Sequence, residues 1–83
     1  MNNPNDIQNA VNELIKEAYE NKENFKEAIN WADLQCVEIL GVNETGSYVA
    51  LVEEVSPDAT EFKNWVEDQA WEKHRLDIFV VTA

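Results

Sequence analysis

Carboxylates are the side chains in this sequence that are most able to do chemistry, because they can bind cations, transfer protons or attract a basic surface. Seventeen Asp and Glu stand against six Lys and Arg, a formal net charge of −11 over 83 residues. Such a charge repels phosphate backbones and anionic lipid headgroups. We therefore expect no direct nucleic-acid binding and no membrane binding, and we expect a basic protein as the partner.

Nucleophilic and metal chemistry have few residues to draw on. The chain has one cysteine, Cys36, and one histidine, His74, and a negative field disfavours the thiolate form of a cysteine. Glu72, His74 and Asp77 lie close in sequence but lack the spacing of zinc sites and of calcium loops. Both glycines fall in a predicted hairpin rather than in a phosphate-binding loop. We expect no catalytic residue, no metal and no cofactor.

The first element that would position acidic side chains is a helix near the N-terminus. Apolar residues recur at three- and four-residue steps over residues 7–18, with Asn5 or Asp6 as the N-cap. The same phase continues as far as Ala32, which favours one helix of roughly 39 Å. The alternative is a break in the polar segment between residues 21 and 24.

A β-hairpin, a second helix and a last strand follow. Residues 34–42 and 48–55 are rich in aliphatic side chains and flank a polar turn. Residues 56–58 read Ser-Pro-Asp, which starts a helix that should run to about Lys73. Residues 76–82 are β-branched and aromatic, as in a strand. The inward face of the second helix should carry Ala59, Phe62, Val66 and Ala70.

The order α-β-β-α-β predicts a single small α+β domain spanning residues 1–83. We expect a three-stranded antiparallel sheet with strand order 2-1-3, because the return helix can carry the last strand past the second one to the first. Both helices should cover one face of this sheet. In topology the arrangement resembles a ferredoxin-like fold that lacks its first strand.

Both faces of the predicted sheet are partly apolar, so helices on one side cannot cover all of it. We expect the second face to dock on a partner or on another copy of the chain as a homodimer. The alternatives are a register shifted by one residue, or a helix folded over the second face. One predicted face carries Val37, Ile39, Val49, Leu51, Ile78 and Val80. The other carries Cys36, Leu40, Tyr48, Ala50, Val52, Phe79 and Val81.

Two groups of carboxylates have no capping role and are the candidate partner-binding residues. On a continuous first helix, one acidic stripe would carry Glu13, Glu17, Glu20 and Glu27, with Trp31 among them. Carboxylates in such a row can stand in for phosphates in a basic groove. The alternative is a solvated helix face, which tolerates like charges at a small cost.

The second group surrounds an aromatic side chain on the polar face of the second helix. Trp71 lies there with Glu67, Asp68 and Glu72, in the half of the helix where the dipole disfavours anions. Tryptophan is enriched among the residues that dominate binding energy, and acids around it would steer a basic partner. The alternative is a structural role, with the turn into the last strand covering Trp71.

Three classes of function remain. In size and charge the chain resembles small acidic immunity proteins, antitoxins, phage DNA mimics and anti-CRISPR proteins. That resemblance implies an inhibitor or decoy that blocks the basic site of a nuclease or another nucleic-acid-binding protein. The second class is a regulatory or accessory subunit that docks through the apolar sheet face. An enzyme is the third class and is disfavoured.

With one cysteine, no signal-peptide pattern and no long apolar run, we expect a cytoplasmic protein, in its own cell or in a host cell.

Overall fold

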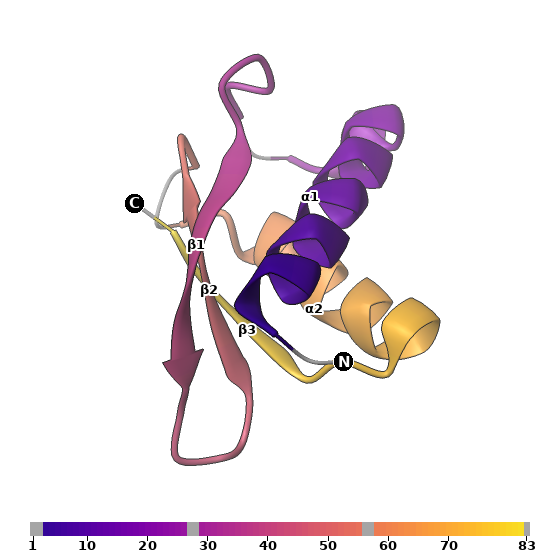
Figure 1. Ribbon diagram of the computed structural model, residues 1–83. Helices are drawn as coiled ribbons and strands as arrows, with labels where there is room; N and C mark the ends of the chain where they lie inside the picture. The colour runs from indigo at the N-terminus through magenta and orange to yellow at the C-terminus, as the bar shows by residue number, and fades with distance from the viewer. Residues whose placement is uncertain (1–2, 27–28, 56–57, 83) are drawn as a thin grey trace.

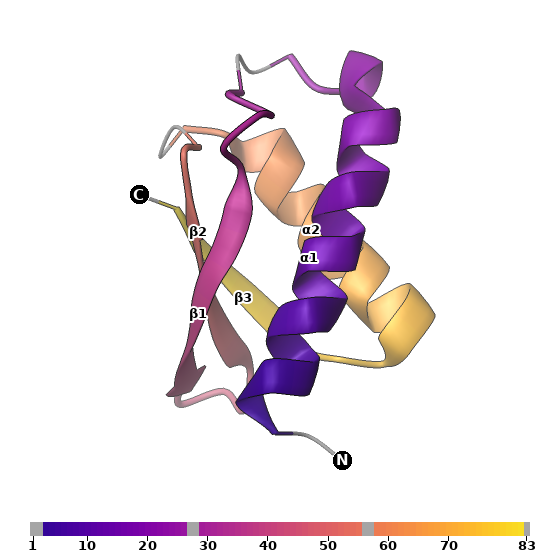
Figure 2. The ribbon, with the colours of Figure 1, turned by 45° about the horizontal axis from the view of Figure 1, so that its top comes forward.

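The computed structural model describes residues 3–26, 29–55 and 58–82. Two helices pack on one face of a three-stranded sheet, and within these ranges no helix lies on the other face of the sheet (Figures 1 and 2). The α+β class and the order α-β-β-α-β are confirmed. The elements are α1 (Pro4–Glu20), the short 3₁₀ helix η1 (Lys22–Asn24), β1 (Gln35–Val42), β2 (Tyr48–Glu53), α2 (Thr60–His74) and β3 (Ile78–Thr82).

Helix α1 begins earlier than the hydrophobic pattern predicts. Its N-cap is Asn3, whose side-chain oxygen accepts the backbone N–H of Asp6 at 3.0 Å, and whose amide donates to the Asp6 carboxylate at 3.0 Å. Predicting Asn5 or Asp6 as the cap was wrong. Pro4 explains the difference, because proline has no N–H to satisfy and its φ suits the first helical position.

Helix α1 ends at Glu20, so the prediction of one helix reaching Ala32 was wrong and the alternative break is the observed structure. Asn21 stops the helix. Its side-chain amide donates to the Glu17 carbonyl at 2.8 Å, and its backbone N–H is shared between the carbonyls of Glu17 and Ala18. Asparagine favours such local bonds over helix continuation.

An aromatic cluster follows from this break, because the chain after η1 turns back onto α2. The Phe25 and Trp31 ring centroids lie 6.0 Å and 5.9 Å from that of Phe62, both edge-on. Tyr19 packs edge-on against Trp31 at 5.7 Å, and Trp65 against Phe25 at 5.9 Å. Edge-to-face pairs at such distances are favourable beyond the area they bury. The cluster therefore fastens the segment after α1 to the first half of α2.

The hairpin of β1 and β2 is confirmed, but the predicted position of the last strand is wrong. The strand order is β1-β2-β3, and β3 runs parallel to β2. The sheet is therefore mixed, and neither the order 2-1-3 nor the ferredoxin-like topology holds. A strand, helix and strand that follow one another are commonly joined by a right-handed crossover to the neighbouring position, which produces such a parallel pair.

Side chains from α1 occupy the edge of β1 where the last strand was expected. The side-chain amide of Gln8 donates to the carbonyls of Cys36 and Val37, each at 3.0 Å. The backbone N–H of Cys36 donates to the Asn12 side-chain oxygen at 2.8 Å. These backbone groups are the ones a neighbouring strand would need. With them engaged, the free edge of β2 is the place where β3 pairs.

The parallel register decides which side chains face the helices. Ala50 pairs with Val80 and Tyr48 with Ile78, so the buried Ile78 and Val80 share the helix-covered face with Ala50. Grouping Ile78 and Val80 with Val49 was wrong. Bulges in β1 further disturb the expected alternation. The uncovered side, called the outer face below, carries Val49, Leu51, Phe79 and Val81.

The core lies between the helices and the covered face of the sheet. The predicted inward residues of the second helix are all buried, and this part of the prediction is confirmed. α2 ends at His74, one residue beyond the expected end, while residues 56–57 of the predicted start lie outside the described residues. No helix in the described part of the chain is both long and apolar enough to cross a bilayer. Helix α1 contributes Ile7, Val11, Leu14, Ile15 and Ala18 to this core.

Candidate functional site

The second half of α2 and the start of β3 form the most distinctive surface feature. Trp71 lies on α2 with 52% of its surface exposed. The helix then ends in an αL cap: the N–H of Arg75 donates to the Trp71 carbonyl at 3.0 Å, and the N–H of Leu76 to the Ala70 carbonyl at 3.1 Å. Arg75 adopts the left-handed conformation that this turn requires, with φ 53° and ψ 34°.

This turn brings the chain back beside the end of α2 and into β3 (Figure 1). The space between them is an open cavity of about 380 Å³, called the Trp71 groove below. Its walls combine an indole and two aliphatic side chains with three carboxylates. It is lined by Glu67, Asp68, Trp71, Leu76, Asp77 and Ile78.

Two of the three carboxylates are held in place by one oxygen each. Glu67 accepts the backbone N–H of Val80 at 2.9 Å, and Asp77 accepts the hydroxyl of Ser47 at 2.9 Å. The Asp77 carbonyl bonds to β2, so the Val80 N–H, three residues later, points to the free edge of β3. Glu67 therefore occupies this edge as well as lining the groove. Asp68 lies exposed beside it.

A cation already rests on the indole of this groove. The guanidinium carbon of Arg75 lies 5.3 Å from the centroid of the Trp71 ring. This distance is within the range of a cation–π interaction, for which tryptophan is the best aromatic partner. The Trp71 face is thus compatible with a guanidinium group, and both side chains are exposed.

Three of the four carboxylates predicted as a stripe on the first helix lie on α1. Glu13 and Glu20 are exposed on α1, whereas Glu17 is half-buried and forms an ion pair with Lys73 of α2 at 2.7 Å. The second carboxylate oxygen of Glu17 is buried and has no hydrogen-bond partner among the described residues. Glu27 lies outside the described residues. The structure therefore gives Glu17 an interhelical contact, while its role in partner binding stays a prediction.

The two candidate anchors lie in different surroundings. Trp31 is half-buried in the aromatic cluster with Tyr19, Phe25 and Phe62. Trp71 is exposed at the groove, with Glu67 and Asp68 beside it, while Glu72 is exposed at the next position of α2. The break after α1 accounts for this difference, because it removes Trp31 from the acidic helix face and turns it toward α2.

Alanine substitutions at these two tryptophans should lower stability by different amounts. Trp31→Ala should lower the free energy of unfolding by about 2–4 kcal/mol, because it removes ring contacts from the aromatic cluster. Trp71→Ala should cost less than about 1 kcal/mol, since it loses one exposed cation–π contact. Urea unfolding followed by circular dichroism measures both. Equal losses for the two variants would show that Trp71 is structural.

Cys36 is not placed for nucleophilic chemistry. The thiol is buried among core side chains, and its desolvation raises its pKa, although a backbone hydrogen bond with Glu38 acts in the opposite direction. A raised pKa keeps the thiol protonated near neutral pH. Among the described residues, no three His, Cys, Asp or Glu side chains are grouped so that they could hold a metal ion.

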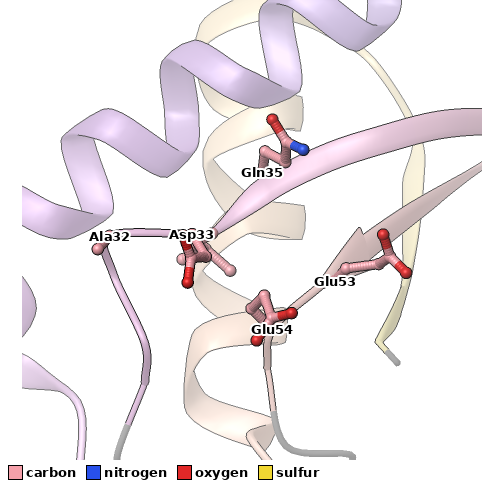
Figure 3. A pocket seen from close by; sticks show the side chains of 6 residues that line it. Ala32, Asp33, Gln35, Glu53 and Glu54 are labelled. Atoms are coloured by element: carbon pink, nitrogen blue, oxygen red, sulfur yellow. The ribbon is translucent and has the colours of Figure 1, made fainter.

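A second acidic cavity lies where the chain enters β1 and leaves β2. It measures about 290 Å³ and contains no aromatic side chain. In Figure 3 the Glu53 carboxylate points away from those of Asp33 and Glu54, so the three do not converge on one point. This cavity is therefore the weaker candidate. Its lining residues are Ala32, Asp33, Leu34, Gln35, Glu53 and Glu54.

The sequence did not predict the roles of two residues beside Trp71. Arg75 stands four residues after Trp71, a spacing that places side chains together on a helix, and this signal was available. Asp77 entered only as a possible metal ligand, because nothing local shows that the chain after α2 returns alongside the helix. Arg75 adds a cation to a surface that appeared wholly acidic.

Comparison of the chain with protein-family models, with curated proteins and with solved structures finds no match.

Proposed function

We propose that this protein is a non-enzymatic acidic binding module that inhibits a nuclease or another nucleic-acid-binding protein by occupying its basic site. The observation that carries the proposal is the excess of unpaired carboxylate charge. The net charge of −11 leaves most carboxylates without a cation to pair with. Between residues that the structure describes, there is one ion pair, Lys73 with Glu17.

An unpaired acidic surface favours this class of partner for a physical reason. Complementary charge increases the rate of encounter and selects against acidic partners, while it adds less to the final affinity. A side chain that buries apolar area is then needed to hold the complex. Trp71 supplies it, because it is exposed and lies in a groove with Glu67, Asp68 and Asp77.

Competition with nucleic acid tests the proposal. The protein that the chain captures from cell extract at low salt would be purified, and its binding to a labelled DNA or RNA duplex measured with increasing amounts of the chain. We expect the chain to displace the duplex. Simultaneous binding of duplex and chain by the captured protein would contradict the inhibitor function.

A matched pair of variants shows whether the groove takes part. Asp68→Asn with Glu72→Gln removes two charges beside Trp71, and Glu38→Gln with Glu44→Gln removes two exposed charges on the hairpin. If the groove faces the partner, the first pair should weaken displacement more than the second. Equal effects would mean that overall charge, and not this surface, directs binding.

The outer face supports a second candidate, an accessory subunit that docks through its sheet. Phe79 has 48% of its surface exposed and pairs with Val49, and Leu51 pairs with Val81 beside them. Binding through this apolar surface would change little with salt and would be lost in Phe79→Ser. Two copies of the chain meeting here would bring two charges of −11 together, so a homodimer is the less favoured form of this candidate.

A further inference from the structure

We propose that the Trp71 groove is an arginine-binding site, in which a guanidinium group of the basic partner replaces Arg75 on the Trp71 ring. The proposal deepens the proposed function, and it rests on it for the existence of a basic partner. It commits the groove to one kind of occupant, an arginine side chain on the partner's surface.

The first support is the guanidinium that already packs on the Trp71 ring. Arg75 lies over the Trp71 ring at 5.3 Å, which shows that the exposed face of the indole accommodates this group. Arginine is better suited to such a face than lysine, because its planar guanidinium stacks on aromatic rings and is less strongly hydrated. An exposed contact of this kind is weak, so an incoming arginine can displace Arg75 at little cost.

The second support is the complementary charge of the groove wall. Glu67 and Asp77 each use one oxygen in a bond that orients the carboxylate, which leaves the other oxygen as an acceptor. Asp68 adds an exposed carboxylate to the same wall. A guanidinium carries five N–H donors in a fixed plane and can bond to carboxylates while it stacks on a ring. The cavity of about 380 Å³ is open to such a side chain.

The backbone conformation of Arg75 provides a variant that tests the proposal. Its φ of 53° lies in the left-handed region, where glycine is the usual residue at the end of a helix. Glycine at this position would satisfy the turn with less strain. Arg75→Gly is therefore a variant that empties the Trp71 face while it preserves the fold.

Two synthetic peptides of equal length and charge serve as probes, one alternating arginine with glycine and the other lysine with glycine. Isothermal titration gives their affinities for the full chain at fixed salt. We expect the arginine peptide to bind about two- to fivefold more tightly, the ratio that corresponds to one exposed cation–π contact. The indole N–H signal that disappears in Trp71→Ala should shift in the NMR spectrum when the arginine peptide is added.

Three variants separate the groove from overall charge. Trp71→Ala should bind both peptides equally. Arg75→Gly should bind the arginine peptide more tightly than the native chain does, because the internal competitor is gone. Lys16→Gln removes one positive charge from an exposed site on α1 and should increase the affinity for both peptides by the same smaller factor.

Equal affinity for the two peptides in the native chain would overturn the arginine site, as would an arginine preference that survives Trp71→Ala. So would a gain in Arg75→Gly that is no larger than the gain in Lys16→Gln. None of these results decides the proposed function, which is tested separately by competition with nucleic acid.

Discussion

Phe62→Ala should lower the free energy of unfolding by about 3–5 kcal/mol, the range for truncation of a fully buried aromatic residue. Phe62 has no exposed surface, and its ring meets Phe25 and Trp31 edge-on at 6.0 Å and 5.9 Å. Truncation leaves a cavity at the point where α2 meets the segment after α1. Domains of this kind have a total stability of about 5–15 kcal/mol, so the loss is a large share of it.

Urea unfolding measured by far-ultraviolet circular dichroism gives this change from the midpoint and slope of the transition. Lys63→Ala is the control, because the neighbouring side chain is only half-buried and should change stability by less than about 0.5 kcal/mol. If Phe62→Ala cost less than about 1 kcal/mol, the aromatic cluster would not be the packed centre that the ring geometry describes.

The second large effect is the dependence of partner binding on salt. Between about 0.01 M and 1 M salt, the Debye length falls from about 30 Å to about 3 Å, and steering by the acidic surface should vanish. The association rate constant with the captured partner should then fall by a factor of about 10–10³. Stopped-flow fluorescence measures this rate, and the dissociation rate should change much less.

Charge variants make this prediction specific to the surface of α2. Asp68→Asn with Glu72→Gln should flatten the dependence on salt, since two of the exposed charges that attract the partner are gone. Phe79→Ser on the outer face is the control and should leave the association rate unchanged. An association rate that does not change with salt, together with faster dissociation of the Phe79→Ser variant from the partner, would favour the accessory-subunit candidate instead.

Local patterns predicted the elements well where one face of an element is buried. The inward residues of α2 repeat at helical spacing and all lie in the core, and a polar turn separates the two strands of the hairpin. These features depend on neighbours in the chain. The end of α1 was harder to predict, because the apolar pattern continues past Asn21 and indicates a longer helix. The side chain of Asn21 instead donates to the Glu17 carbonyl and ends the helix.

The strand order could not be read from periodicity. An alternating or apolar strand indicates which residues are buried, but it does not indicate which neighbour the strand joins. Here the edge of β1 is occupied by Gln8 and Asn12 of α1, residues more than 20 positions away in the chain. That long-range contact, with the crossover through α2, places β3 beside β2.

By itself the sequence determined the charge, the α-β-β-α-β order and the presence of carboxylates around Trp71, since these depend on composition and on residues close together in the chain. The tertiary structure alone decided that Trp31 packs in the aromatic cluster and that Trp71 stays exposed, because these outcomes depend on contacts with residues distant in the chain. It also decided that Arg75 lies on the Trp71 ring and that Asp77 returns to the same groove. The physical reason is the αL turn at Arg75 after α2, which reverses the chain and brings the start of β3 beside the helix it has just left.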